Sequence, residues 1–146
     1  MQPLHLVNII KETIGDLMGK TVGFLGLSFK PNTDDVRETR ALSIIEHLFQ
    51  EGVKIRAYDP KAMHEAQEFY LKGVEAVTYC NSKYETLVDA DAMILLTDWK
   101  EFRIPDFEEL KAQLKQPVIF DGRNQYSDKM MKKNGFEYFQ IGKKSD

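Results

Sequence analysis

Hydrophobic residues recur along this chain with two periods that alternate from one end to the other. Apolar runs and every-second-residue patterns are typical of strands, and they occupy residues 21–26, 53–59, 74–79, 90–98, 116–122 and 136–142. The last of these runs fits either a strand or an extended tail. Apolar residues three or four positions apart are typical of amphipathic helices, and they occupy residues 3–18, 41–52, 61–73, 82–89, 105–114 and 127–135.

Residues with strong positional preferences support several of these boundaries. Gly19 is a candidate C-terminal stop for the first helix. Ser82 is a candidate N-cap, and Glu85 completes a capping box with it. Pro105 is expected in the first turn of its helix. Over residues 41–52 the spacing predicts one buried helix face, formed by Leu42, Ile45, Leu48 and Phe49.

Strands that alternate with helices at this spacing imply βαβ units around a parallel sheet. We therefore predict an α/β fold, a Rossmann-like three-layer sandwich with a mostly parallel sheet of five to six strands, preceded by the end of a long helix. The 146 residues suffice for one domain with a substantial core. The predicted organisation is the end of a helix over residues 1–19 and the sandwich domain over residues 20–146.

Composition and charge exclude several classes of function. The net charge of −3 comes without a long basic tract, which argues against a nucleic-acid surface. The single cysteine, Cys80, excludes an internal disulfide framework and a cysteine-based zinc site. There is neither a signal peptide nor an apolar run long enough to span a membrane, so the cytoplasm is the expected location.

The connection after the first strand is unusually long and charged. It covers residues 27–38, where about two to six residues usually suffice. Lys30 and Arg37 are spaced to reach different anions, and charge-assisted bonds to phosphate are among the stronger hydrogen bonds. Three acidic residues can hold these cations in place: Asp34, Asp35 and Glu38. Composition alone equally allows a solvated loop with surface ion pairs.

Ligands of open α/β sheets bind outside the carboxyl ends of the strands, so polar residues that follow predicted strands are candidate ligand contacts. Arg123 in "DGRN" and Trp99, the only tryptophan, stand out at such positions. Asp59 follows the second strand, where an acidic residue can bind a ribose hydroxyl, although it can equally cap the next helix.

The first strand does not end in a dinucleotide-binding fingerprint. Its glycines, Gly23 and Gly26, do not follow the G-x-G-x-x-G spacing, and Gly23 lies within the strand. We therefore expect no NAD binding of that kind. A phosphoacceptor receiver is also disfavoured, because Asp34 and Asp35 come too late after the strand and the fifth strand ends in Asp121 instead of a lysine.

Catalytic chemistry has few candidates. The three histidines lie on predicted helices without partners at metal-ligand spacing: His5, His47 and His64. Cys80 precedes a helix, which allows a reactive thiolate, but a partly buried structural thiol is favoured. These patterns by themselves lead to a ligand-binding α/β domain without a catalytic site.

Several motifs, in order, resemble the C-terminal domain of the UDP-glucose/GDP-mannose dehydrogenase family: "GKTVGFLGLSFKPNTDDVRETRALSIIEHL", "YDP", "LLTDWKEF" and "IFDGRNQY". The resemblance covers nearly the whole chain, and "GLSFKPNTDDVRE" is its most specific part. It implies an N-terminal domain that binds NAD, a central helix that carries the dimer contact, and a C-terminal domain that binds the UDP part of a UDP-sugar. Residues 3–18 are then the end of the central helix.

The resemblance also implies roles for four residues. Phe29 and Lys30 contact the UDP-sugar, with Lys30 near the phosphates. Arg123 is similar to the family arginine that helps to hold the nucleotide sugar, in some members across a subunit boundary. Arg37 reaches toward NAD bound by the other domain. Family enzymes oxidise the sugar C6 alcohol twice, through a thiohemiacetal on a cysteine of the central region, and Cys80 lacks the glycine-rich context of that cysteine.

From this resemblance we expect an excised domain that lacks both the catalytic cysteine and the NAD-binding domain. By itself it would bind UDP or a UDP-sugar weakly and turn over nothing. The alternatives are a stand-alone nucleotide-binding or regulatory module on the same fold, and part of a dehydrogenase for another UDP-sugar such as UDP-N-acetylmannosamine.

Overall fold

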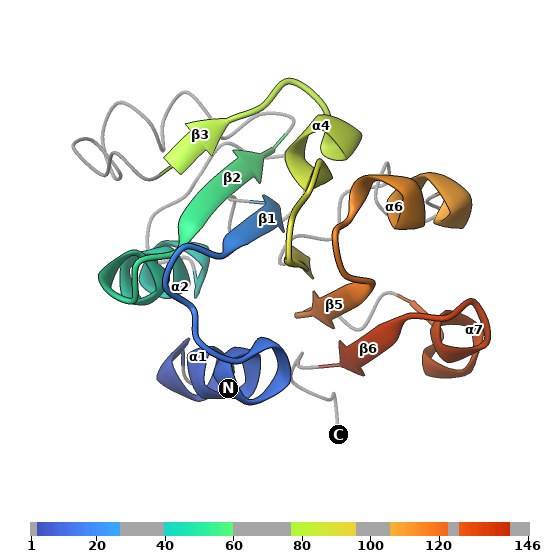
Figure 1. The fold of residues 1–146 in the computed structure, drawn as a ribbon, viewed down its shortest axis with the longest axis horizontal. Coiled ribbons are helices and arrows are strands. Elements are labelled where there is room, and N and C mark those ends of the chain that lie inside the picture. Colours follow the sequence, from blue (N-terminus) through green and yellow to red (C-terminus); the bar gives the residue numbers. More distant parts are fainter. Residues whose placement is uncertain (1–2, 27–39, 60–76, 96–105, 123–125, 141–146) are drawn as a thin grey trace.

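The computed structural model describes residues 3–26, 40–59, 77–95, 106–122 and 126–140, and for residues 3–5 and 40–43 the backbone alone. One sheet is formed by six strands (Figure 1): β1 (Thr21–Leu25), β2 (Lys54–Tyr58), β3 (Val77–Tyr79), β4 (Ala92–Leu95), β5 (Val118–Asp121) and β6 (Glu137–Gln140). The helices are α1 (Pro3–Ile14), α2 (Arg40–Gln50), α4 (Lys83–Leu87), α6 (Phe107–Gln113) and α7 (Asp128–Lys133). The predicted helix over residues 61–73 lies outside the described residues.

The strand order is β3-β2-β1-β4-β5-β6, and every neighbouring pair is parallel. This confirms the predicted α/β sandwich with a parallel sheet. The last apolar run is strand β6, which pairs with β5, and not an extended tail. From β1 the chain adds strands toward one edge of the sheet, and from β4 toward the other. The direction of winding therefore reverses between β1 and β4.

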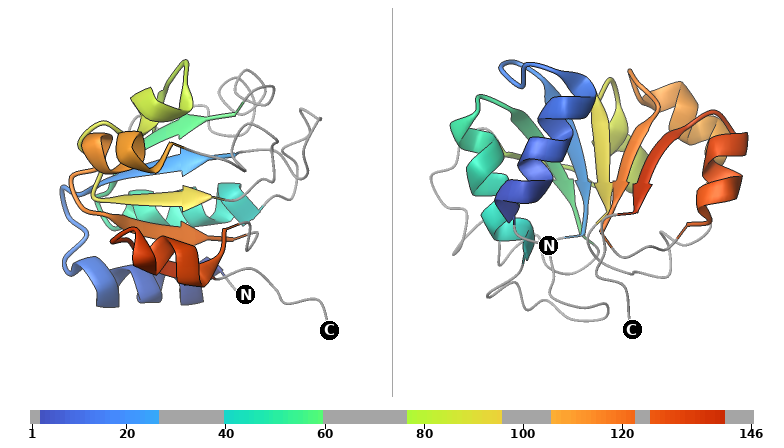
Figure 2. Two further views of the ribbon diagram at one scale, coloured as in Figure 1. Left: turned by 90° about the vertical axis from the view of Figure 1, so that its right-hand side faces the viewer. Right: turned by 90° about the horizontal axis from the view of Figure 1, so that it is seen from below.

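Helices cover both faces of the sheet, α1 and α2 on one face and α4, α6 and α7 on the other (Figures 1 and 2). The alternation of side chains along β4 shows the same division. Ala92 and Ile94 belong to one core cluster, and Met93 and Leu95 to the other. All four residues are fully buried, which explains why this strand reads as a continuous apolar run.

The first helix ends earlier than predicted. α1 stops at Ile14, before Gly15, whose φ of +82° takes the backbone out of the helix. The predicted stop at Gly19 is therefore wrong. Leu17 is nevertheless buried, as its helical spacing suggested, because a turn after the helix brings it back onto the core. In this turn the Asp16 side chain accepts a bond from the Met18 N–H at 3.1 Å.

Helix α1 packs into the core of the domain. Leu6, Val7 and Ile10 are at most 1% exposed and join the cluster under α2. An exposed ion pair between Lys11 and Glu51, at 2.7 Å, connects α1 to the turn after α2. Burial of three large aliphatic side chains contributes far more than such a surface pair, which is worth about 0–1 kcal/mol. The domain boundary between residues 19 and 20 stays a prediction.

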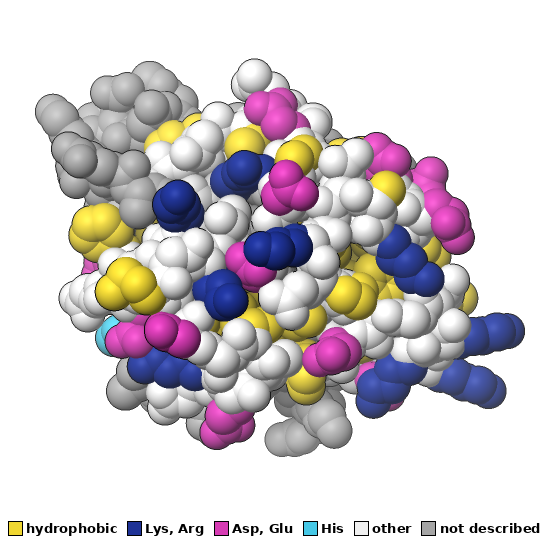
Figure 3. Space-filling view, viewed as in Figure 1, with side chains coloured by type: hydrophobic (Ala, Val, Ile, Leu, Met, Phe, Trp, Pro, Cys, Tyr) yellow, Lys and Arg dark blue, Asp and Glu magenta, His cyan; other side chains and the backbone are white. Residues whose placement is uncertain are grey.

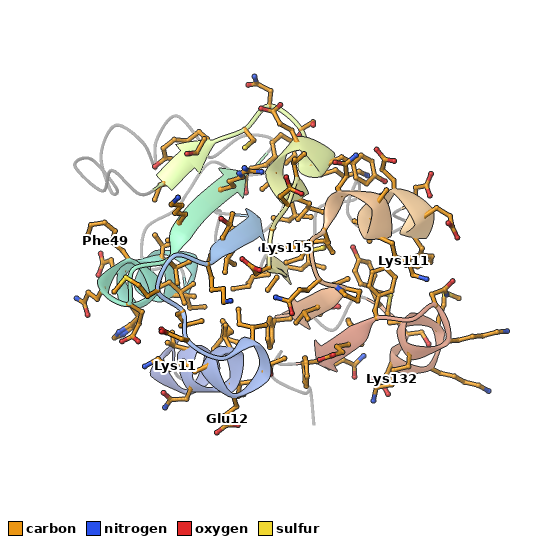
Figure 4. All side chains as sticks on the ribbon, in the orientation of Figure 1. Lys11, Glu12, Phe49, Lys111, Lys115 and Lys132 are labelled. Atoms are coloured by element: carbon orange, nitrogen blue, oxygen red, sulfur yellow. The ribbon has the colours of Figure 1, made fainter. Side chains whose placement is uncertain are left out.

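One residue of the predicted buried face of α2 is exposed. Ile45 and Leu48 are fully buried, but Phe49 is 42% exposed and points away from the molecule in Figure 4. Ile44 is buried in its place. Each helical residue turns by about 100°, so Phe49 lies beyond the stripe that Ile44, Ile45 and Leu48 define. Leu42 lies outside the side chains that are described.

The helix starts on the second face follow local capping. The predicted cap of α4 is confirmed, because Ser82 Oγ accepts a bond from the Glu85 N–H at 3.2 Å. For α6 the N-cap is Asp106, whose carboxylate accepts from the Glu109 N–H at 3.2 Å. Pro105 therefore precedes the cap, and its predicted place in the first turn is wrong.

Candidate functional site at the carboxyl edge of the sheet

The carboxyl ends of five strands form a continuous row. Hydrogen-bond register places these residues side by side across the sheet, in the order Tyr58, Leu25, Leu95, Asp121 and Gln140. The arrowheads of β1 and β4 point toward this edge in the left view of Figure 2. In a doubly wound sheet, the crevice for ligands lies at this edge, at the point where the winding reverses. The crevice here is therefore expected between the ends of β1 and β4.

Three connections start at this part of the edge. Residues 27–39 follow β1, residues 96–105 follow β4, and residues 123–125 come shortly after β5. Neighbouring strands are about 4.8 Å apart, so the ends of β1 and β5, on either side of β4, are about 10 Å apart.

The predicted ligand contacts all belong to these connections. Phe29, Lys30 and Arg37 lie in residues 27–39, and Arg123 lies in residues 123–125, so all four are outside the described residues. Trp99 is outside them as well. The last described residue before each connection is Gly26 after β1, Leu95 at the end of β4 and Gly122 after β5.

The two described glycines in and directly after the first strand both serve the packing or hydrogen bonding of the sheet. A Cβ on Gly23 would lie 2.8 Å from the Thr86 carbonyl oxygen, so this glycine permits close packing of α4 on β1. The Gly26 N–H donates to the Tyr58 carbonyl at 2.9 Å and so belongs to the sheet. The turn that follows Gly26 lies outside the described residues, so the expectation of no dinucleotide fingerprint there stays a prediction.

Two other residues at the strand ends are buried. A contact with a ribose hydroxyl would require the Asp59 carboxylate to reach the surface. Asp59 is 0% exposed, so its carboxylate does not do so. Cys80 is 3% exposed, and burial raises the pKa of its thiol. A hydrogen bond with Thr86 opposes this rise, and the charges of Glu85, which raises the pKa, and Arg56, which lowers it, have smaller effects. A reactive thiolate needs the opposite environment, so Cys80 is a structural thiol.

Asp121, at the end of β5, anchors the chain that returns from residues 123–125. Its side chain is 0% exposed, and Oδ2 accepts from the Tyr126 N–H at 3.0 Å and from the Tyr138 hydroxyl at 2.6 Å. The Tyr138 hydroxyl also lies 2.9 Å from the Tyr126 carbonyl oxygen, which accepts from Gln140 Nε2 at 2.9 Å. The backbone N–H and C=O of Tyr126 are thus both held by side chains of β5 and β6.

Sequence reasoning missed this network. Asp121 was one of several polar residues after strands, and neither Tyr138 nor Gln140 was singled out. The available signal was an acidic residue at the very end of a buried strand, where an unpaired charge would be costly. Its partner Tyr138 lies 17 residues away, on a strand whose place in the sheet no local pattern reveals.

Buried phenols make the stability of the chain depend on alkaline pH. Burial raises the pKa of Tyr79 to about 12, and burial with the neighbouring Asp121 carboxylate raises the pKa of Tyr138. A tyrosine whose pKa in the folded state is raised above the ordinary value of about 10 stabilises the folded state. Its contribution to the free energy of unfolding is fully present below about pH 10 and is lost as the pH rises toward about 12 and beyond. We expect the urea midpoint to be lower at pH 11 than at pH 8. The drop should be smaller in Tyr138→Phe, and an equal drop in both proteins would contradict the assignment to Tyr138.

Other features limit the chemistry of the described part of the chain. No group of three or more potential metal-ligating side chains lies together among the described residues. None of the described helices has the length and apolar character needed to cross a membrane. On the face shown in Figure 3, Lys and Arg side chains are interspersed with Asp and Glu side chains, so that face carries no large field of one sign.

The parallel sheet, its helices on both faces and its winding reversal define a ligand-binding domain of the doubly wound α/β class. Within this class, the chain belongs to the UDP-glucose/GDP-mannose dehydrogenase family, because residues 23–128 match the model of that family's UDP binding domain.

Individual relatives agree with this family. The chain is 42% identical over 142 residues to the UDP-glucose 6-dehydrogenase TuaD of Bacillus subtilis, covering 97% of the chain and 30% of TuaD. A UDP-glucose dehydrogenase structure from Pyrobaculum islandicum superposes with a TM-score of 0.78 at 31% identity, over 97% of the chain and 29% of that protein. The UDP-N-acetyl-mannosamine dehydrogenase Cap5O of Staphylococcus aureus gives 0.70 at 28% identity, over 96% and 30%. The chain thus spans less than a third of the length of each.

Proposed function

We propose that this chain is the UDP-sugar-binding part of an NAD-dependent UDP-glucose 6-dehydrogenase, which oxidises UDP-glucose to UDP-glucuronate. The observation that carries the proposal is the family match over residues 23–128. It includes both connections that start at the winding reversal and the connection that follows Gly122. The 42% identity to a UDP-glucose 6-dehydrogenase favours glucose as the sugar.

In this proposal the residues of the chain bind and orient the substrate. Lys30 and Arg123 neutralise the diphosphate from the two sides of β4, and Phe29 contacts the same ligand. Arg37 reaches NAD held by another domain of the enzyme, and NAD supplies the hydride acceptor for the reaction. The remaining domains would also supply the catalytic cysteine and the contact of a homodimer, and the cytoplasm is the proposed location.

A dehydrogenase for another UDP-sugar is the second candidate. The structural likeness to a UDP-N-acetyl-mannosamine dehydrogenase, at 28% identity, favours it. Steady-state rates of the full-length enzyme with a panel of UDP-sugars would separate the two candidates. The first requires UDP-glucose to have the highest kcat/KM, and a preference for an N-acetylated sugar would support the second.

The division of work between the two cations can be tested in the 146-residue chain. Lys30→Ala should weaken UDP binding by about 10-fold to 100-fold, because a charge-assisted bond to phosphate contributes about 1.5–3 kcal/mol. Arg37→Ala should leave the affinity within about twofold, because its proposed partner is NAD on another domain. Titration calorimetry with UDP measures both dissociation constants.

Lys132→Ala is a matched control for the loss of one positive charge. Lys132 is an exposed residue of α7 and pairs with Asp128 at 3.2 Å. Helix α7 leads into the amino end of β6. This variant should bind UDP like the unchanged chain. A larger loss of affinity in Arg37→Ala than in Lys30→Ala would contradict the assigned roles.

A further inference from the structure

We propose that Asp121 is a positioning residue for nucleotide-sugar binding. Its buried carboxylate holds Tyr126, three residues after Arg123, and thereby restrains the far end of the connection that contains Arg123. The inference rests on the proposed function, in which Arg123 contacts the UDP-sugar, but it concerns side chains that are assigned no role in that binding.

The connection that contains Arg123 is held at both of its described ends. At one end, the Gly122 N–H donates to the Leu95 carbonyl at 2.7 Å, which ties the exit of β5 to β4. At the other end, Asp121 Oδ2 accepts from the Tyr126 N–H at 3.0 Å. Arg123 directly follows Gly122, so its backbone starts from a point that is hydrogen-bonded to the strand beside the winding reversal. Only Arg123, Asn124 and Gln125 separate the two held ends, Gly122 and Tyr126.

The carboxylate is suited to hold Tyr126 because its charge strengthens the bonds it accepts. The distance of 2.6 Å from the Tyr138 hydroxyl is typical of an O–H donor on an ionised oxygen. Both donors converge on the same carboxylate oxygen inside the protein, where competing water is excluded. A neutral amide at position 121 keeps the shape of the side chain but lacks the negative charge that attracts the two donors.

The Tyr126 side chain adds a second restraint. Tyr126 is 6% exposed and belongs to the core cluster on the second face, and its ring centroid lies 6.2 Å from that of Tyr138. Tyr126 is therefore fixed by its N–H, by its C=O and by its ring. An attachment of this kind at the ligand edge serves to hold the adjoining cation ready for the diphosphate, so that less ordering remains when the ligand binds.

Asp91 provides a matched control. It is also buried, at 5% exposure, and accepts two bonds, from the Thr21 N–H at 3.0 Å and from Gln116 Nε2 at 3.1 Å. However, it precedes β4 and faces the start of β1, so it lies at the amino edge of the sheet, opposite the candidate site. Asp91→Asn should lower stability and leave UDP affinity unchanged.

The test is a double-mutant cycle, measured by titration calorimetry of the 146-residue chain with UDP. Asp121→Asn is expected to weaken binding about 10-fold, and Asp91→Asn less than about twofold. In the Arg123→Ala background, Asp121→Asn should cause no further loss of UDP affinity. The proposed effect of Asp121 on binding requires the Arg123 side chain, which this background lacks. Equal losses with and without Arg123, or an equal loss in Asp91→Asn, would overturn the inference.

A second measurement does not depend on the ligand. Backbone amide relaxation by NMR should show larger motions of Gly122, Arg123 and Tyr126 in Asp121→Asn, and unchanged motions there in Asp91→Asn. Tyr138→Phe, which keeps the carboxylate and the ring, should show the same effect to a smaller degree and serves if Asp121→Asn does not fold. Unchanged motions in both Asp121→Asn and Tyr138→Phe would overturn the inference.

The outcomes also separate this inference from the proposed function. If the unchanged chain does not bind UDP, the proposed function is contradicted, and with it the role of Asp121 in binding. If the unchanged chain binds UDP and Arg123→Ala weakens binding, but Asp121→Asn does not, the proposed function stands and the inference fails.

Discussion

Phe120→Ala is expected to lower the free energy of unfolding by about 3–5 kcal/mol, the usual cost of removing a buried phenylalanine ring. Phe120 is fully buried at the centre of β5, and its ring stacks on Phe139 with centroids 5.2 Å apart. Phe120 also pairs in register with Ile94 on β4. The void left by removing its ring would therefore take packing away from both neighbouring strands, β4 and β6. Urea unfolding monitored by circular dichroism measures the change as a shift of the midpoint at constant slope.

Phe49→Ala is the control with the same chemical change. Phe49 is 42% exposed on α2 and points away from the molecule (Figure 4), so its truncation leaves no enclosed void. Its loss should lower the free energy of unfolding by less than about 1 kcal/mol. Similar losses in the two variants would contradict the burial of Phe120 that the structure describes.

Gly23→Val is expected to lower the free energy of unfolding by about 3 kcal/mol, the upper end of the usual range for overpacking a core. A Cβ at this position would lie 2.8 Å from the Thr86 carbonyl oxygen and 2.9 Å from Leu87 Cδ2. The carbonyl is part of the backbone of α4 and cannot rotate away as a side chain can. Helix α4 would have to move off β1, and the same urea titration measures the cost.

Gly15→Ala separates steric contact from backbone strain. Gly15 has nothing within 4 Å of the place where a Cβ would be, but its φ of +82° is unfavourable for other residues. We expect a loss of about 1 kcal/mol there, for conformational reasons alone. Gly23→Val should therefore cost clearly more than Gly15→Ala, and the reverse order would show that the contact with α4 is not the reason for glycine at position 23.

The relation between the candidate site and the core makes these stability predictions relevant to function. Phe120 precedes Asp121, and Gly23 lies two residues before the end of β1, so both residues support strands whose carboxyl ends border the expected crevice. Pairing across β1, β4 and β5 places these ends in one row. A domain of this kind can vary its connections for ligand binding while a rigid sheet fixes their starting points.

Local patterns predicted most elements and failed where two local signals competed. Gly15 and Gly19 both have positive φ, and the chain leaves the helix at Gly15. The sequence did not show this, because the helical spacing of apolar residues continues to Leu17. At α6, an aspartate that accepts the Glu109 N–H decided the start of the helix, and the proline before it did not. Phe49 was assigned to the buried face by its helical spacing with Ile45 and Leu48, but the buried stripe of α2 is shifted toward Ile44 and leaves Phe49 outside it.

By itself, the sequence determined the order and type of the described elements and the family of the chain. These properties follow from hydrophobic periodicity and from short motifs, which reside in contiguous residues. Only the tertiary structure decided that β4 lies beside β1, that Gly23 makes room for Thr86 of α4, and that Asp121 is bonded to Tyr138. The physical reason is that these contacts join residues distant in the chain, and they exist only after the sheet is assembled and the helices pack on it.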